Sequence, residues 1–269
     1  MQNKTVIVTG ASSGIGLACA REFASHGASV VLAARNAEKI NAAAEELNAG
    51  GFKALAVQTD VSVEEDCKRL IGAAIDRYGR IDVLINNAGI SMRALFSDTE
   101  LRVLKQLMDV NFWGTVYCTK YALPFLMETG GSVAGVSSIA GYQGLPGRTG
   151  YSASKFAMHG FLESLRIETL KSGLHVLIAA PGFTASNIRK TALAADGSAQ
   201  GESPRAEEKM MTADQVAEHL FRAIIKRQRS LVLTQQGRAT VLLKKLAPSI
   251  VERLVYKHFA NEPDSPLNE

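Results

Sequence analysis

The sequence is poor in cysteine: its 269 residues include only three, Cys19, Cys67 and Cys118. The number is odd, the three lie far apart, and each falls in a stretch that we expect to be helical. This pattern indicates a reducing compartment and argues against both disulfides and a zinc site. The five histidines are scattered without the spacing of metal ligands, so we expect no catalytic metal.

Long apolar runs are also missing, and we expect no leader. No apolar run reaches the ~18 residues that a membrane span requires. Residues 5–8 form a strand-like run so near the N-terminus that we expect no signal peptide. The net charge of +4 is small, and no lysine- or arginine-rich block alternates with aromatic residues, which argues against a nucleic-acid partner. We therefore expect a cytoplasmic protein with no transmembrane segment.

Short apolar runs rich in β-branched residues alternate with longer amphipathic stretches along most of the chain. The expected strands are residues 6–8, 30–32, 54–57, 83–85, 132–136, 175–178 and 230–234, and the expected helices are 15–25, 37–47, 64–78, 101–127, one that begins near Tyr151, and 212–227. This alternation predicts an α/β fold of Rossmann type, a doubly wound parallel sheet with helices on both faces. No internal boundary is visible, so we expect a single domain, with residues 1–237 as its Rossmann part and 238–269 as a helical extension.

A glycine-rich turn, residues 9–16, follows the first expected strand. Glycines at positions 10, 14 and 16 permit a tight turn, close approach of the backbone to a phosphate, and close packing of the next helix. The spacing departs from the usual dinucleotide fingerprint, and no lysine follows Gly16, which excludes a P-loop. A plain glycine-rich turn is the alternative interpretation of this segment alone.

The ends of the next strands carry further candidates, because ligands of open α/β sheets lie beyond the carboxyl ends of the strands. The second strand ends at Arg35, where a carboxylate would hold a ribose 2′-hydroxyl and a cation would pair with a 2′-phosphate. The alternative is a solvated arginine in a loop. Asp60 and Val61 follow the third strand and are placed to meet an adenine edge. Residues 86–89 follow the fourth, and their small side chains would let a cofactor lie against the backbone.

Tyr151 and Lys155 lie four residues apart in an expected helix and so share one of its faces. Lowering the pKa of a phenol by ~3 units from about 10 requires about 4 kcal/mol in favour of the phenolate. A cation ~4 Å away supplies about 1 kcal/mol in water and about 4 kcal/mol at an effective dielectric constant of ~20. The pair therefore works as an acid and base only in a pocket that excludes most water. Taken alone, such a pair is more often structural.

These motifs together resemble the short-chain dehydrogenase/reductase family. The matching segments are TGASSGIG at residues 9–16, NNAG at 86–89, Asn111, Ser138, YSASK at 151–155 and PG at 181–182. They occur in the family's order and spacing, and the resemblance covers roughly residues 4 to 190. It extends to the C-terminal region, which is more similar to hydroxysteroid-dehydrogenase-like members than to acyl-carrier-protein reductases.

The resemblance implies roles for four catalytic residues. Tyr151 would exchange a proton with the carbonyl or hydroxyl oxygen, Lys155 would lower the pKa of Tyr151 and hold the nicotinamide ribose, and Ser138 would hydrogen-bond the substrate oxygen. Asn111 would sit in a helix irregularity that supports a water-linked proton relay. The implied cofactor-binding residues are Gly10, Ser12, Ser13, Gly14, Ile15, Gly16, Arg35, Asp60, Val61, Asn87, Ala88, Gly89, Tyr151, Lys155, Pro181, Gly182, Thr184 and Ser186. Ser13 stands where many NADP-dependent members carry Lys or Arg, so the expectation of NADP rests mainly on Arg35.

The expected activity is an NADP(H)-dependent oxidoreductase that interconverts a ketone or aldehyde with an alcohol, on a lipophilic substrate. Three alternatives stay open at this point. They are an NAD-dependent alcohol or hydroxysteroid dehydrogenase, a 3-oxoacyl-thioester reductase, and, more remotely, a cofactor-sensing protein without turnover. Intact Ser138, Tyr151 and Lys155 argue against the last. We read His159, one turn beyond Lys155, as a packing or surface residue.

Two segments lie outside the shared motifs. Residues 190–211 are polar and small, so we expect them to bury little and to be mobile. The family resemblance implies that this segment covers the substrate. Residues 238–259 predict two short amphipathic helices around Pro248. Their apolar face could pack on the parent domain or a dimer mate, wall a lipophilic substrate, or touch a membrane surface weakly. We expect a homodimer, with a homotetramer as the alternative.

Overall fold

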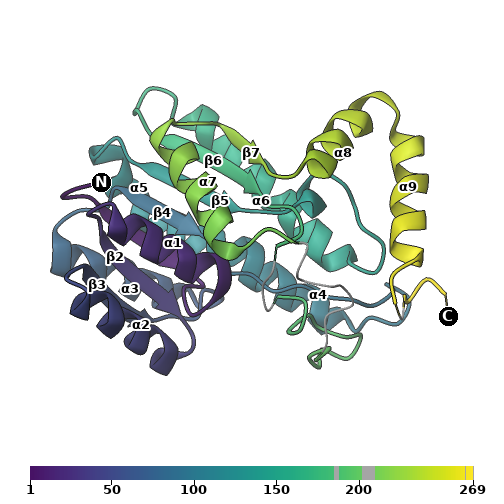
Figure 1. The fold of residues 1–269 in the computed structure, drawn as a ribbon, viewed down its shortest axis with the longest axis horizontal. Coiled ribbons are helices and arrows are strands. Elements are labelled where there is room, and N and C mark those ends of the chain that lie inside the picture. Colours follow the sequence, from purple (N-terminus) through teal and green to yellow (C-terminus); the bar gives the residue numbers. More distant parts are fainter. Residues whose placement is uncertain (185–187, 202–209, 264, 269) are drawn as a thin grey trace.

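The computed structural model describes residues 1–184, 188–201, 210–263 and 265–268. Its strands form one parallel sheet in the order β3-β2-β1-β4-β5-β6-β7 (Figure 1). The strands are β1 (Thr5–Thr9), β2 (Ser29–Ala34), β3 (Lys53–Gln58), β4 (Val83–Asn86), β5 (Ser132–Val136), β6 (His175–Ala180) and β7 (Ser230–Val232). The expected doubly wound parallel sheet is confirmed.

The helices alternate with the strands, as the sequence predicts. They are α1 (Gly14–Ser25), α2 (Ala37–Ala49), α3 (Glu64–Tyr78), α4 (Leu101–Met108), α5 (Gly114–Glu128), α6 (Thr149–Glu168), α7 (Ala213–Ile225), α8 (Gln235–Leu246) and α9 (Pro248–Ala260). The stretch 101–127 is helical, as expected, but it is not one continuous α-helix. A π-helical turn, Asp109–Trp113, separates α4 from α5. The turn contains Asn111 and is the helix irregularity that the family resemblance implied there, although the apolar spacing alone does not indicate it.

Both faces of the sheet are buried, because helices cover each of them. Alternate residues of β1 point to opposite sides, so Val6 and Val8 join one core and Ile7 joins the other. Helices α1 and α7 pack side by side over the first face, and α3 and α5 pack over the second. The inner strands are accordingly apolar along almost their whole length, the pattern of a parallel sheet with two covered faces.

The strand order reverses between β1 and β4, and side-chain hydrogen bonds fix the loops at this point. The Thr9 hydroxyl accepts hydrogen bonds from the backbone N–H groups of Asn87 and Ala88, each at 3.0 Å. The Asn87 side-chain amide donates to the Thr9 carbonyl at 2.9 Å. The loops after β1 and β4 therefore meet at the switch point, the place where open α/β sheets bind their ligands.

The C-terminal helices stand apart from the sheet (Figure 1). The two expected helices are confirmed, with Pro248 at the first position of α9, where its missing N–H is no loss. Much of their expected apolar face is uncovered: the exposed members are Leu242, Leu246, Ile250 and Leu254. Phe259 is buried. Within the described residues, no helix combines the length and the hydropathy that crossing a bilayer requires.

The segment after β6 departs from expectation where it is described. The segment was expected to bury little, but its Leu193 is buried, and the backbone of Leu193 pairs with the loop after β4. Its N–H donates to the Ser91 carbonyl at 2.8 Å, and its carbonyl accepts from the Arg93 N–H at 2.9 Å. Residues 202–209 lie outside the described part of the chain.

Candidate active site

The three residues expected to carry the chemistry line one small cavity of about 160 Å³. Ser138 follows β5, and Tyr151 and Lys155 lie one turn apart on α6. The side chains of Tyr151 and Lys155 are buried, and the Lys155 Nζ lies 5.8 Å from the centroid of the Tyr151 ring. This is the water-poor environment in which a phenol and an ammonium can influence each other strongly.

Burial has opposite effects on these two groups. It raises the pKa of Tyr151, an effect that a hydrogen bond with Ser138 and the charge of Arg148 reduce but do not reverse. Burial lowers the pKa of Lys155 to about 8, because it disfavours the charged ammonium. The Lys155 Nζ donates to the Val136 carbonyl at 3.0 Å. That Lys155 lowers the pKa of Tyr151 stays a prediction.

Asn111 lies in the π-helical turn and is fully buried. Its side-chain carbonyl accepts from the Ile90 N–H at 2.8 Å, and its amide donates to the Ile90 carbonyl at 3.0 Å. The same amide donates to the Ser154 hydroxyl at 2.9 Å. Asn111 thus ties the loop after β4 to α6, and Gly89 leaves room for it, since a Cβ there would lie 3.1 Å from the Asn111 Oδ1.

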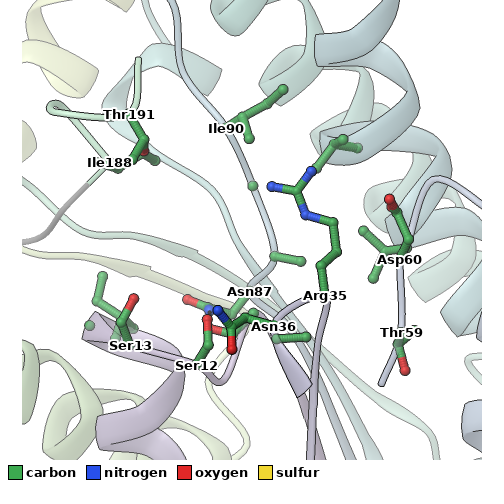
Figure 2. Close-up of a pocket in the computed structure, with 18 of the residues that line it drawn as sticks. Ser12, Ser13, Arg35, Asn36, Thr59, Asp60, Asn87, Ile90, Ile188 and Thr191 are labelled. Carbon is green, nitrogen blue, oxygen red and sulfur yellow. Dashed lines mark hydrogen bonds between the residues drawn. The ribbon is translucent and has the colours of Figure 1, made fainter. Parts of the chain in front are cut away.

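A second and larger pocket, of about 690 Å³, opens at the switch point (Figure 2). Most of the expected cofactor-binding residues line it: Gly10, Ser12, Ser13, Gly14, Ile15, Arg35, Asp60, Val61, Asn87, Ala88 and Gly89. Gly16 packs closely against the turn, since a Cβ at this position would lie 2.3 Å from the Gly10 carbonyl oxygen. Gly10 has a φ of +67°, a conformation that favours glycine. The turn and the N-terminus of α1 thus form a cradle that fits a dinucleotide phosphate.

Arg35 extends into this pocket, with Ser12 and Ser13 on one side of it and Asp60 on the other (Figure 2). The Asp60 carboxylate is held by its own turn, where it accepts from the Ser62 N–H at 3.0 Å and from the Ser62 hydroxyl at 2.7 Å. Lining residues that the sequence reasoning missed are Asn36, Lys39, Thr59, Ile90, Val110, Ile188 and Thr191. The position of Lys39, one turn beyond Arg35, was a signal that could have identified a second cation.

The segment after β6 closes the small cavity. Pro181, Gly182 and Thr184, three of the residues predicted to bind the cofactor, line it. Ser186, the remaining expected cofactor residue, lies outside the described residues. Sequence reasoning did not identify Arg148 as a lining residue, although it stands only three positions before Tyr151.

A third pocket, of about 430 Å³ and mostly apolar, adjoins the small cavity on the side away from the switch point. The two share Ser138, Leu145, Pro181, Gly182, Phe183 and Phe259. The C-terminal helices form much of its wall, with side chains that include Leu243, Val251, Val255 and Phe259. Among the described residues, this apolar pocket and the pocket at the switch point have no lining residue in common.

His159 packs against residues next to the small cavity. It is buried, its Nε2 lies 2.7 Å from the Ser137 hydroxyl, and its ring meets the edge of Tyr142. Burial and the charge of Lys155 lower the pKa of His159 to about 4. The interpretation as a packing residue is confirmed. No group of three or more His, Cys, Asp or Glu side chains that could hold a metal is found in the part of the chain that the structure describes.

Comparison with known proteins defines the class to which this fold and site belong. Residues 4–197 match the family model described as short chain dehydrogenase, so the chain belongs to the short-chain dehydrogenase/reductase family. Members are oxidoreductases that act on alcohol and carbonyl groups, and the relatives of this chain include hydroxysteroid-dehydrogenase-like proteins.

Two relatives match along nearly the whole chain. The chain is 35% identical to dehydrogenase/reductase SDR family member 7B of Bos taurus, over 98% of this chain and 84% of that one. It is also 35% identical to 11-beta-hydroxysteroid dehydrogenase A of Arachis hypogaea, over 99% of this chain and 78% of that one.

Two solved structures share the fold. The alcohol dehydrogenase of Thermococcus sibiricus, solved in complex with 5-hydroxy-NADP, is 25% identical with a TM-score of 0.76, over 86% of this chain and 95% of that one. A short-chain dehydrogenase/reductase of Burkholderia phymatum, solved with NAD, has a TM-score of 0.83 at 23% identity, over 93% of this chain and 95% of that one.

Proposed function

We propose that this protein is an NADP(H)-dependent oxidoreductase that interconverts an apolar ketone or aldehyde with the corresponding alcohol. One observation supports this proposal above the others. The small cavity with Ser138, Tyr151 and Lys155 lies between a polar pocket suited to a dinucleotide and an apolar pocket of about 430 Å³. A pocket of that size is within the range that encloses drug-sized ligands.

The preference for NADP is argued from charge. Arg35 and Lys39 line the polar pocket beyond β2, where an acidic residue would instead favour the free ribose of NAD. A guanidinium suits a phosphate in charge and geometry. The Thermococcus enzyme was solved with a derivative of NADP, which is consistent with this choice. Asp60 and Val61 line the same pocket and would border the adenine.

The residues of the small cavity divide the work of the reaction. When bound, the nicotinamide supplies or accepts the hydride. Tyr151 donates its proton to the carbonyl oxygen as negative charge develops there, and Ser138 donates a hydrogen bond to the same oxygen. Lys155, with a pKa of about 8, is mostly charged at neutral pH and favours the Tyr151 phenolate that remains. Asn111 holds Ile90 and Ser154 in place for a proton relay.

The apolar pocket supports a lipophilic substrate of the size of a steroid or a medium-chain ketone. The relative from Arachis hypogaea is named as a hydroxysteroid dehydrogenase, which is consistent with a lipophilic substrate. A 3-oxoacyl thioester would carry a polar carrier group, and the described wall of this pocket is mostly apolar.

We propose that the protein forms a homodimer, because part of its apolar surface is exposed. Large apolar side chains lie exposed on the π-helical turn, α5 and α6, among them Trp113, Met127, Phe156 and Ile167. They support a homodimer, which sedimentation velocity would detect as a single species of twice the 28.8 kDa chain mass.

A cofactor-consumption screen tests the proposed function. Purified protein is mixed with NADPH or NADH and with steroid ketones, aromatic ketones, acyl ketones and sugars. We expect apolar ketones to be reduced fastest, and NADPH to be preferred over NADH by at least about tenfold in kcat/KM, about 1.4 kcal/mol. Equal use of both cofactors would contradict the role of Arg35. Best activity on sugars would contradict the role of the apolar pocket.

A further inference from the structure

The C-terminal segment ends in a cluster of buried charges that the family motifs do not include. The Glu262 Oε2 lies 3.3 Å from an Nη of Arg148 and 3.9 Å from the Nε of Arg93. Arg93 also donates to the Pro263 carbonyl at 2.5 Å. The side chains of Arg93, Arg148 and Glu262 are exposed by only 8%, 14% and 5%. We call these three residues the tail cluster.

The tail cluster matters for the position of α9 because this helix has little apolar packing of its own. In this fully described helix the buried residues are Val251 and Phe259, while Ile250 and Leu254 are more than half exposed. Buried charges are stable when they are paired and unfavourable when they are not. The carboxylate of Glu262 places a negative charge between two guanidinium groups that are mostly out of water. Glu262 is therefore a polar anchor for the C-terminal end of α9.

The tail cluster also touches the site directly. The guanidinium of Arg148 lies 4.6 Å above the ring of Phe259, and Phe259 lines both the small cavity and the apolar pocket. Arg148 stands at the start of α6, and its carbonyl accepts from the Ser152 N–H at 2.8 Å, so it is fixed to the helix that carries Tyr151.

The other cation of the tail cluster is fixed as firmly. The Arg93 N–H donates to the Leu193 carbonyl, and the N–H of the next residue, Ala94, donates to the Gly147 carbonyl at 3.0 Å. Glu262 thus joins α9 to three segments at the mouth of the site: the loop after β4, the segment after β6 and the start of α6.

We propose that Glu262 is a specificity-determining positioning residue: through Arg93 and Arg148 it seats α9 and Phe259 as the wall of the apolar pocket, and so sets the affinity for apolar carbonyl substrates. The inference rests on the proposed function, which it deepens. In the described structure Glu262 lines neither the polar pocket nor the small cavity, so we expect cofactor affinity and the turnover of small substrates to change little without it.

Variants of the full-length protein test the proposal. Glu262→Gln removes the charge and keeps the shape, Glu262→Asp keeps the charge, and Glu252→Gln makes the same change as the first at an exposed position of α9. Two quantities are measured on each: amide hydrogen exchange of residues 248–260, and KM and kcat with NADPH for the 2-alkanones from acetone to 2-decanone. Exchange reports the seating of α9 without relying on activity.

In Glu262→Gln we expect exchange of α9 to quicken by at least about tenfold, because local opening no longer breaks an ion pair. We expect KM for 2-decanone to rise at least about tenfold, with acetone kcat/KM and NADPH affinity within about twofold of wild type. Glu262→Asp should keep exchange and KM close to the wild-type values, and Glu252→Gln should change neither. If Glu262→Gln folds poorly, the double variant Glu262→Gln/Arg93→Met should fold better, because it removes one of the two buried positive charges.

Three outcomes would overturn parts of this account separately. Unchanged α9 exchange in Glu262→Gln would refute the seating role, whatever the kinetics. Faster exchange with KM rising equally for all 2-alkanones would refute the role in specificity and leave the proposed function intact. If the wild-type protein reduces none of the ketones with NADPH, the proposed function is refuted. The hydrogen exchange of α9 would then be the one test of whether Glu262 holds α9 in place.

Discussion

The polar pocket and the apolar pocket on either side of Tyr151 are built in different ways. The polar pocket is shaped by backbone, by the turn after β1 and the ends of β2, β3 and β4, with glycines wherever the chain must come close. The apolar pocket is shaped by side chains of α8 and α9 that lie about 100 residues from Ser138 in the sequence. Backbone constraints restrict the residue type at each position, whereas an apolar wall accepts many residues of similar size.

The largest expected effect comes from the residue between the two pockets. Tyr151→Phe keeps the ring and removes the transferable proton, so kcat should fall by about 10²- to 10⁴-fold. Affinity for NADPH, measured by fluorescence titration, should be unchanged. A variant that retains more than about a tenth of the wild-type turnover would rule out Tyr151 as the acid.

The next effect should be confined to the polar pocket. In Gly16→Ala the new Cβ would lie 2.3 Å from the Gly10 carbonyl oxygen, so the turn must shift. Such overpacking typically costs about 1–3 kcal/mol, equivalent to about a 5- to 150-fold loss of NADPH affinity. Gly72→Ala is the matched control, since a Cβ at Gly72 has nothing within 4 Å, and its affinity should equal that of wild type. Equal affinities for all three proteins would mean that the turn does not hold the cofactor.

Arg35→Asp should change the choice of cofactor without closing the pocket. The carboxylate would repel a 2′-phosphate and accept from a free ribose hydroxyl, so the preference for NADPH of at least about tenfold should reverse. Lys68→Asp makes a similar change of charge at an exposed position of α3 and should leave the preference as it is. The ratio of kcat/KM for the two cofactors measures the effect, and a ratio that is the same in Arg35→Asp and wild type would count against Arg35.

The smallest effect should appear only on the apolar side. Leu243 lines the apolar pocket and is 41% exposed, whereas Leu246, on the same helix, is 75% exposed and does not line it in the described structure. Since each buried methylene contributes roughly 0.8 kcal/mol, Leu243→Ala should raise KM for 2-decanone by about 3- to 10-fold. Leu246→Ala should not change it. Identical KM values for the two variants would show that α8 does not contact the substrate.

The parts of the molecule that the sequence predicted well are those in which local chemistry restricts the choice. Buried strands need continuous apolar runs, and the turn after β1 needs glycine at Gly10, so the sheet and the polar pocket could be predicted together. The role of each site residue stays a prediction, as does the extent of the domain.

What the sequence could not predict depends on distant partners. Arg93, Arg148 and Glu262 are separated by 55 and 114 residues, and each alone is an ordinary surface charge until the fold brings them together. The π-helical turn at Asp109–Trp113 was implied by the family resemblance, through Asn111, and not by the apolar spacing, which we read as one long helical stretch.

The absence of any shared lining residue between the polar and apolar pockets, in the described structure, has an evolutionary consequence. Substitutions in α8 and α9 can alter the shape of the substrate side while every contact at the switch point stays the same. A lineage can therefore acquire a new substrate without passing through an ancestor that has lost its cofactor. The C-terminal helices are the part of this chain in which duplicated copies are free to diverge first.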